Sequence, residues 1–515
     1  MTTAPTPSEP TLEKLRQYSS AAMRFLTAQP RLARTLHQAP DLAPLVLRNE
    51  RFPKSHVARL LRQARKRMFL HTACKELEGG SPLDTARLWS DFADNALRLA
   101  DIVVYRELTD RFGEPLSGNG SAIGRSILGL GKLGSRELNP SSDIDLLFAY
   151  ETDDASSSKL SPHEFFVRWV RGVRELLADI DGDGFVFRVD LDLRPEGTTG
   201  ALVNSLDALE NYYERFGRTW ERAAMSRLRP IVDVNDVGIQ LCERLRPFVF
   251  PRTVDVRWID DLADMKQLVT LNAVVEGVDV KRGQGAIREV EFIVQSLQLV
   301  HGGRSPALRQ GSVVELLEAL EQAGLLGHRV VRDLREAYVA LRRIEHALQY
   351  ESDRQTQVLP ATGALREKVA KMLLPHLVDA RRNMSGLDEV LGRHRARVHR
   401  VFSTVLVERR DGPTALSEKA VERTAPDDER LRALEELSLE PADEALRLLR
   451  VLERRVNSPF SPALLASRSG LASLGPRLLD DIAQCPAPRN ALARLPELFT
   501  GYVHHSFYER LASDG

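Results

Sequence analysis

Residues 127–148 read ILGLGKLGSRELNPSSDIDLLF. The segment from Gly129 to Gly134 satisfies the pattern G-x-G-x-x-G, and two aspartates, Asp143 and Asp145, follow it closely. The glycines could form a dinucleotide-binding turn, or the run could serve to deliver the two aspartates to a site. The choice between these two interpretations decides both the fold and the function.

The spacing argues against a dinucleotide site. Such a site needs a long helix after the third glycine and an acidic residue about 20 positions further on. Only nine positions separate Gly134 from Asp143, and Pro140 lies between them. A Walker-type phosphate loop is also excluded, because Lys132 is followed by Leu133 instead of Ser or Thr. The sequence therefore predicts a short connection, of at most two helical turns, between two strands.

The aspartates support the second interpretation. Residues i and i+2 of a strand point to the same face, so Asp143 and Asp145 are expected side by side. Two close carboxylates repel unless a cation lies between them, and Mg²⁺ prefers such oxygen ligands. A further strand, GFVFRVDLDLRPEG (184–197), supplies a third carboxylate as Asp190 or Asp192, which would share one face. Three such acids are typical of metal-dependent phosphoryl or nucleotidyl transfer.

Polar residues around these acids are candidate ligands for the phosphates of a nucleotide. The backbone N–H groups and hydroxyl at Gly134 and Ser135 could bind phosphate oxygens. Arg194 could act as a bidentate donor. Lys132 and Ser142 complete the set that we expect at this position.

The remaining chain is predicted to be mainly helical. Short strands occur only between residues 119 and 255, and the fold class is therefore α+β, mostly helical, with a small mixed sheet. The predicted parts are a helical region (1–118), the sheet-containing core (119–255), a helical bundle (256–406), a polar linker (407–429) and a small helical domain (430–515). Arg342 and Arg343 lie on an amphipathic helix, where a solvated face is the expectation.

Composition limits the partners. Lys+Arg and Asp+Glu both number 72, so no global field attracts nucleic acid or an acidic membrane. The three cysteines form no C-x-x-C pair, and no apolar run reaches a membrane-spanning length. We expect a cytoplasmic protein that binds neither nucleic acid nor membrane.

Several stretches together resemble a known family. They are GLGKLGSRELNPSSDIDLLFAY, FVFRVDLDLRPEG, ALENYYERFGRTWERAAMSRLRPI (208–231), RLRPFVFPR (244–252), GAIREVEFIVQ (285–295) and LRRIEHALQ (341–349). In this order they are similar to the bifunctional glutamine synthetase adenylyltransferase/adenylyl-removing enzymes, which carry nucleotidyltransferase domains of the DNA polymerase β superfamily. The motif E-L-N-x-S-S-D-I-D resembles that of the N-terminal, adenylyl-removing half of these enzymes.

The resemblance implies an activity and its residues. The removing half takes AMP from a tyrosine of glutamine synthetase by phosphorolysis, using phosphate and Mg²⁺ and releasing ADP. Asp143 and Asp145 match the metal-binding pair of the family, and Asp190 matches the third carboxylate. Asp192 departs from the family, which usually has a basic residue there. A PII signalling protein is the implied regulatory partner, and ATP and ADP are the implied nucleotides.

Two alternatives stay open at this point. The first is the opposite reaction, transfer of AMP from ATP to glutamine synthetase. The second is a non-catalytic module that only docks glutamine synthetase and PII. The three acids favour an enzyme over the docking module, because a module without catalysis has no need for carboxylates that repel one another.

Overall fold

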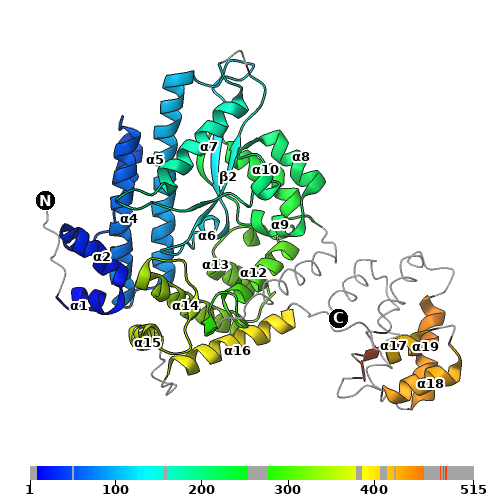
Figure 1. The fold of residues 1–515 in the computed structure, drawn as a ribbon. Coiled ribbons are helices and arrows are strands. Elements are labelled where there is room, and N and C mark those ends of the chain that lie inside the picture. The colour runs from blue at the N-terminus through cyan, green and yellow to red at the C-terminus, as the bar shows by residue number, and fades with distance from the viewer. Residues whose placement is uncertain are drawn as a thin grey trace. The chain divides into compact units, whose positions relative to one another are not determined.

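The computed structural model describes residues 9–48, 51–155, 159–252, 276–377, 386–405, 415–422, 425–437, 439, 441–456, 476, 479–480 and 482–483. The chain divides into two compact units. One comprises Met1–Val254 and Asp264–Phe402, and the other comprises Asp255–Ala263 and Ser403–Gly515. The described residues are mostly helical around one small mixed sheet, which confirms the predicted α+β class (Figure 1).

The first unit begins with helices that precede the sheet. They are α1 (Glu9–Tyr18), α2 (Ser20–Ala28), the 3₁₀ helix η1 (Pro30–Thr35), α3 (Ala43–Arg48), α4 (Lys54–Leu77) and α5 (Pro82–Phe112). The long helix α5 begins where the sequence predicts, because the Ser81 side chain accepts a hydrogen bond from the Leu83 N–H and Pro82 occupies the first turn. Helices α4 and α5 run beside each other, and α5 also packs on strand β5 of the sheet (Figure 1).

The sheet has the strand order β3-β2-β1-β5, and β4 also pairs with β2. Its strands are β1 (Arg125–Gly129), β2 (Ile144–Tyr150), β3 (Val189–Asp190), β4 (Asn204–Ser205) and β5 (Arg229–Val234). Strand β1 is antiparallel to both β2 and β5, whereas β3 and β4 are parallel to β2. The short β3 therefore lies against the first residues of β2, where the predicted aspartates are.

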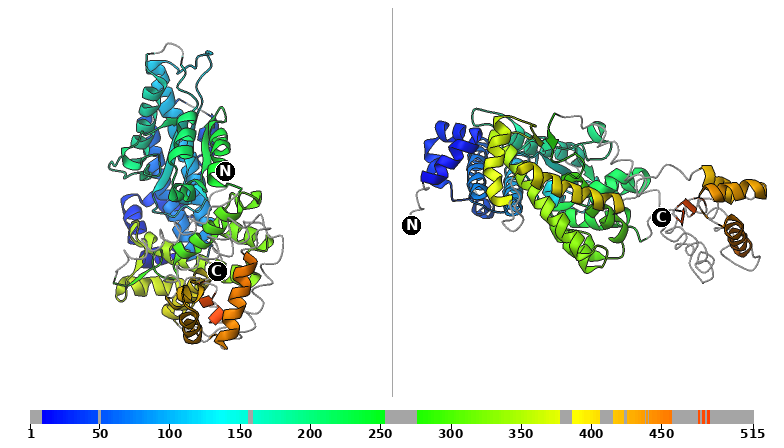
Figure 2. Two further views of the ribbon diagram at one scale, coloured as in Figure 1. Left: turned by 90° about the vertical axis from the view of Figure 1, so that its right-hand side faces the viewer. Right: turned by 90° about the horizontal axis from the view of Figure 1, so that it is seen from below.

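The two faces of β2 have different neighbours. One face packs on helix α7 (Pro162–Ala178), with the Phe148 ring 5.2 Å from Trp169 and the Tyr150 ring 4.8 Å from Phe166. Side chains alternate along a strand, so Asp145 projects to the opposite face. Helices α8 (Leu206–Phe216) and α9 (Thr219–Met225) follow β4, and α10 (Val237–Val249) follows β5. Helix α8 contacts β4 and α10 packs on β1 and β5; this part of the chain is drawn in green in Figure 2.

A second helical region follows, which belongs to the first unit except for the last three residues of its final helix. It consists of α12 (Ile287–His301), the 3₁₀ helix η3 (Pro306–Leu308), α13 (Val313–Gln322), α14 (His328–Ser352), α15 (Ala364–Leu377) and α16 (Leu387–Val405), with a small antiparallel pair, β6 (Val278–Asp279) and β7 (Val358–Leu359). Helix α14 is the longest of these and packs on α5 from the N-terminal region. It thereby joins the two helical regions that surround the sheet.

The second unit is described over a smaller share of its residues. Its helices are α17 (Ala415–Val421), α18 (Asp427–Glu436) and α19 (Ala442–Val456), and they enclose buried Ala420, Leu434 and Leu446. Helix α17 lies within the segment that the sequence suggests as a linker. Most of the predicted domain 430–515 lies outside the described residues.

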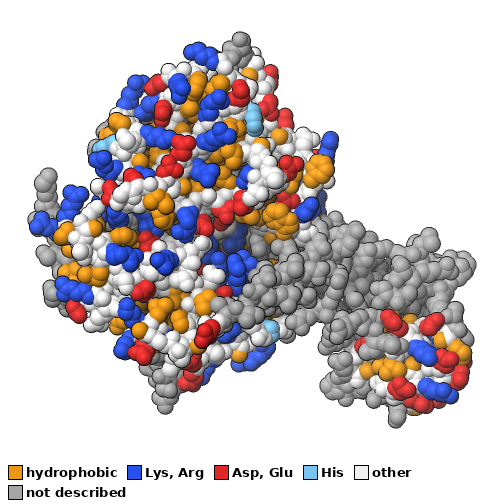
Figure 3. All heavy atoms as spheres, in the orientation of Figure 1, with side chains coloured by type: hydrophobic (Ala, Val, Ile, Leu, Met, Phe, Trp, Pro, Cys, Tyr) orange, Lys and Arg blue, Asp and Glu red, His pale blue; other side chains and the backbone are white. Residues whose placement is uncertain are grey.

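The surface carries charges of both signs. On the face drawn in Figure 3, Lys and Arg side chains are interspersed with Asp and Glu over the first unit. In the part of the chain that the structure describes, no helix combines the length and the apolar character needed to cross a bilayer. Phosphate binding in this unit would therefore depend on cations at a local site.

Candidate active site

The glycine run forms a single helical turn between β1 and β2. Helix α6 spans only Gly131–Gly134, and the sequence then runs through turns to β2. Gly131 has φ +52°, and a Cβ atom at this position would lie 2.3 Å from Asp145 Oδ2. A Cβ atom at Gly134 would lie 2.0 Å from the Arg227 carbonyl oxygen. The glycines therefore allow close packing around an aspartate, and the short helix excludes the dinucleotide interpretation, as predicted.

The strand register places a third acid next to this aspartate. Asp145 of β2 pairs with Asp190 of β3 in a parallel register, and Asp143 directly precedes β2. Paired residues of neighbouring strands project to the same face of a sheet. Burial, followed by the charges of Asp190 and Asp143, raises the pKa of Asp145 to about 6. The site therefore concentrates negative charge, which a cation would relieve.

The donor set suits a hard divalent cation in its chemistry, since all three candidates are carboxylates. Among the described residues, however, no three acidic, His or Cys side chains are placed closely enough to hold a metal ion as they stand. Asp143 is instead paired with Arg188, whose Nε donates to Asp143 Oδ1 and whose Nη2 donates to the Ser141 carbonyl oxygen at 2.6 Å. To bind a metal ion, the Asp143 carboxylate would have to give up its ion pair with Arg188.

Asp192 is placed differently from the expectation. The prediction that Asp190 and Asp192 share one face of one strand is wrong, because β3 ends at Asp190 and Asp192 lies in the following turn. The Asp192 side chain is 63% exposed and lies 3.7 Å from Arg194 Nη1. Its backbone N–H donates to Asp190 Oδ1 at 2.8 Å. The turn thus supports Asp190 and directs Asp192 into solvent.

Arg194 organises this turn through all three of its nitrogens. They donate to the carbonyl oxygens of Gly200 (3.1 Å), Leu191 (2.8 Å) and Thr198 (2.9 Å). The side chain is buried. Its hydrogen-bonding capacity is therefore directed to the loop after β3, and a role in phosphate binding would have to compete with these bonds.

The predicted phosphate donors near α6 are also largely engaged. The Gly134 N–H donates to the Leu130 carbonyl at 2.8 Å, and the Ser135 N–H donates to the Gly131 carbonyl at 3.2 Å. The Ser135 hydroxyl donates to the same Gly131 oxygen at 3.1 Å. Ser142 Oγ, by contrast, makes no hydrogen bond to another residue of the described chain, so no described residue competes with a ligand for this hydroxyl.

Lys132 forms a buried ion pair that the sequence does not reveal. Its Nζ lies 3.0 Å from Glu345 Oε1 of α14, and both side chains are buried. Burial lowers the pKa of Lys132 to about 8, and the charge of Glu345 partly offsets this effect. Lys132 and Lys281 in turn oppose the rise in the pKa of Asp145. A cation held by α14 therefore acts electrostatically on the predicted metal site.

The expectation of a solvated face on this helix is wrong. Arg342 is 0% exposed and Arg343 is 8% exposed. Arg342 Nη2 donates to the Glu137 carbonyl oxygen at 2.6 Å, so that the helix faces the β1–β2 connection instead of water. Arg188 and Glu345 are further residues next to the site that the sequence pattern does not predict there. The helical spacing of Tyr338, Arg342, Glu345 and Gln349 was the available signal for a polar inward face.

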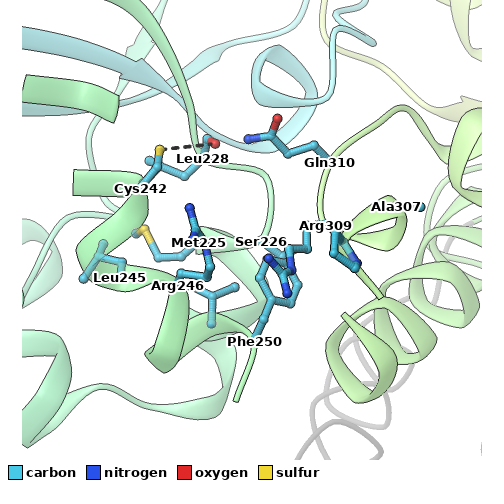
Figure 4. A pocket seen from close by; sticks show the side chains of 12 residues that line it. Met225, Ser226, Leu228, Cys242, Leu245, Arg246, Phe250, Ala307, Arg309 and Gln310 are labelled. Carbon is cyan, nitrogen blue, oxygen red and sulfur yellow. Dashed lines mark hydrogen bonds between the residues drawn. The ribbon is translucent and has the colours of Figure 1, made fainter. Parts of the chain in front are cut away.

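A separate cavity of about 450 Å³ lies beside α9 and α10. Met225, Leu245 and Phe250 give it apolar walls, and Arg246 and Arg309 bring guanidinium groups to it (Figure 4). None of the three carboxylates lines this cavity. It is therefore distinct from the candidate active site.

Comparison with known proteins agrees with this geometry. Residues 7–244 match the family described as glutamate-ammonia ligase adenylyltransferase, and residues 261–406 match the family described as GlnD PII-uridylyltransferase. Similar curated proteins are the bifunctional glutamine synthetase adenylyltransferase/adenylyl-removing enzymes of several bacteria. That of Pseudomonas putida is 43% identical over 328 residues, which cover 62% of this chain and 34% of the relative.

Two further relatives extend the match. The enzyme of Hahella chejuensis is 35% identical over 471 residues (88% of this chain, 48% of the relative), and that of Pseudomonas aeruginosa is 36% identical over 472 residues (88% and 47%). The chain thus spans less than half the length of these relatives.

The sheet, its paired acids and these matches define the class of protein as a nucleotidyltransferase. More particularly, residues 7–244 carry a domain of the glutamate-ammonia ligase adenylyltransferase family, and most of the chain is similar to the bifunctional glutamine synthetase adenylyltransferase/adenylyl-removing enzymes.

Proposed function

We propose that this chain removes AMP from an adenylylated tyrosine of glutamine synthetase by Mg²⁺-dependent phosphorolysis, releasing ADP. The observation that carries the proposal is the parallel register of Asp145 with Asp190, next to Asp143. The names of the relatives contain both adenylyl transfer and adenylyl removal. The motif E-L-N-x-S-S-D-I-D around the first two acids resembles the removing half and favours removal.

The reaction exchanges one phosphorus–oxygen bond for another. An oxygen of inorganic phosphate attacks the phosphorus of AMP, and the bond from that phosphorus to the tyrosyl oxygen breaks. ADP leaves, and the tyrosyl oxygen gains a proton. Tyrosine has a solution pKa of about 10, so its oxygen is an adequate leaving group. No protein nucleophile is needed.

The residues of this chain have distinct roles in the proposal. Asp143, Asp145 and Asp190 would hold the cation, and Asp143 would release Arg188 in doing so. The bound cation would supply positive charge where two anionic phosphates meet. Lys132, fixed by Glu345, adds a protein cation behind the same carboxylates. Ser142, next to Asp143 in the chain, and the freed Arg188 would orient phosphate oxygens.

The direct test uses adenylylated glutamine synthetase, Mg²⁺ and inorganic phosphate with the purified chain. We expect release of ADP that depends on both phosphate and metal. AMP as the product would indicate hydrolysis, and no release of nucleotide would contradict the proposed activity. Asp145→Asn is the matched inactive control, because it keeps the size of the side chain and removes its charge.

The opposite reaction is the second candidate, since the same three acids could serve AMP transfer from ATP. Incubation of unmodified glutamine synthetase with ATP and this chain distinguishes the two, and incorporation of AMP would support transfer. Regulation by a PII protein belongs to the proposal as well. It is motivated by the match of residues 261–406 to the uridylyltransferase family.

A further inference from the structure

One face of α14 carries a line of buried polar side chains. They recur at helical spacing, so they project in the same direction. All are at most 1% exposed: Tyr338, Arg342, Glu345, His346 and Gln349. Asp353, in the left-handed cap of the helix at φ 56°, extends the line by one turn. We call these six residues the α14 polar face.

This face contacts the connection between β1 and β2 along much of its length. The Tyr338 hydroxyl donates to Glu137 Oε1 at 3.0 Å, and Arg342 Nη2 donates to the carbonyl oxygen of the same Glu137 at 2.6 Å. His346 Nε2 lies 3.0 Å from Asn139 Oδ1. These contacts hold Glu137 and Asn139, in the middle of the connection and ahead of Asp143 in the chain.

Further contacts reach the end of the connection. Gln349 Oε1 accepts from the Ser141 N–H at 3.1 Å, and Asp353 Oδ1 accepts from the Ser141 hydroxyl at 2.8 Å. Asp353 is itself fixed by Arg65 of α4 through two bonds of 2.8 Å. Glu137, Asn139 and Ser141 of the connection thus meet successive turns of α14.

The choice of polar side chains needs an explanation. Apolar side chains would join the helix to the sheet with less desolvation, because each buried polar group must find a partner. Hydrogen bonds to particular backbone and side-chain atoms hold the connection in a single conformation. Apolar packing alone is not directional and does not do this. Ser141, which is bound by Gln349 and Asp353, lies two positions before Asp143 in the chain.

We propose that the α14 polar face positions the β1–β2 connection so that Asp143 and Asp145 can bind metal together with Asp190. The inference rests on the proposed function, since it assumes a metal site at these acids. The members of the face are positioning residues: the geometry of the metal ligands on the sheet is set by a helix of the following helical region.

A purely structural role predicts a different result from a positioning role. The same helix offers a matched control, because the Tyr350 hydroxyl donates to Glu76 Oε1 of α4 at 3.3 Å and does not contact the connection. Tyr350→Phe removes a buried hydrogen bond of α14 in the same way as Gln349→Met does. Only Gln349→Met removes a bond to the connection.

The experiment measures Mn²⁺ binding to the full chain by electron paramagnetic resonance, together with the unfolding temperature. Mn²⁺ binds to carboxylates as Mg²⁺ does. We expect Gln349→Met to weaken Mn²⁺ binding about 10-fold, in the range seen when groups that orient metal ligands are removed. Tyr350→Phe should lower the unfolding temperature and leave Mn²⁺ affinity unchanged.

The outcomes separate the inference from the proposed function. Equal Mn²⁺ affinity of Gln349→Met and the unsubstituted chain, or equal weakening in both variants, would overturn the inference alone. Absence of Mn²⁺ binding by the unsubstituted chain would overturn the proposed metal site and the inference with it. If Gln349→Met does not fold, Ser141→Ala removes only the hydroxyl bond to Asp353 and should weaken binding about fivefold.

Discussion

The two D-x-D segments of the sheet have the same sequence pattern and different surroundings. In the first, Asp145 is enclosed beside Gly131 and paired in register with Asp190. In the second, Asp190 faces the first segment, whereas Asp192 lies in a turn with its side chain 63% exposed. The register of the neighbouring strand, and not the D-x-D motif alone, therefore decides which carboxylates lie next to each other.

The largest expected effect is on activity. Asp145→Asn should lower the rate of AMP release by about 10³-fold, because loss of metal-mediated charge stabilisation costs several kcal/mol in the transition state. The rate is measured with adenylylated glutamine synthetase, and circular dichroism checks that the fold is retained. Activity within tenfold of the unsubstituted chain would show that Asp145 is not a metal ligand.

The next effect concerns the turn that separates Asp190 from Asp192. Arg194→Gln removes buried guanidinium bonds to three carbonyl oxygens, and we expect the free energy of unfolding to fall by about 3 kcal/mol. Arg188→Gln is the matched comparison, because Arg188 is 41% exposed and exposed ion pairs contribute less than about 1 kcal/mol. Both values come from urea unfolding. Equal losses in the two variants would contradict a special role for Arg194 in the turn.

A smaller effect concerns the stability of the folded chain, which the ionised carboxylate of Asp145 lowers. The pKa of Asp145, about 6, lies above that of an unfolded aspartate, so ionisation on raising the pH from about 4 to about 6 destabilises the folded chain. In EDTA at pH 7, Asp145→Asn should therefore be more stable than the unsubstituted chain by about 2 kcal/mol.

The gain from Asp145→Asn should vanish below about pH 4, where the carboxyl group is protonated in both the folded and the unfolded states. Thermal unfolding at several pH values measures it. A gain that is independent of pH would mean that the repulsion among the three acids is not its source. Saturating Mg²⁺ should reverse the order of stability at pH 7, since only the unsubstituted chain binds it well.

The sequence predicted those parts of the site that depend on local pattern. The strands around Ile127 and Phe148 and the short turn after Gly134 follow from periodicity and spacing. The common face of Asp143 and Asp145 stays a prediction, because β2 begins only at Ile144. Asp190 was preferred over Asp192 from the family resemblance, because alternation alone assigns both to one face. Local pattern does not show that β3 ends at Asp190.

The rest depends on contacts between distant segments. Arg194 and Lys132 were expected at phosphates because isolated cations near acids suggest this role, yet their partners are carbonyl oxygens after β3 and Glu345 of α14. The buried Arg342 was expected in solvent, since its partner Glu137 is 205 positions away. Long-range partners of this kind cannot be inferred from one sequence.

The most direct test compares Asp190→Asn with Asp192→Asn in the phosphorolysis assay. We expect Asp190→Asn to abolish ADP release, as Asp145→Asn does. Asp192→Asn should keep activity within about twofold, since an exposed carboxylate in a turn contributes little. Mn²⁺ binding to the same two variants should show the same contrast. If Asp192→Asn is inactive and Asp190→Asn retains activity, the assignment of the third carboxylate from strand register is wrong.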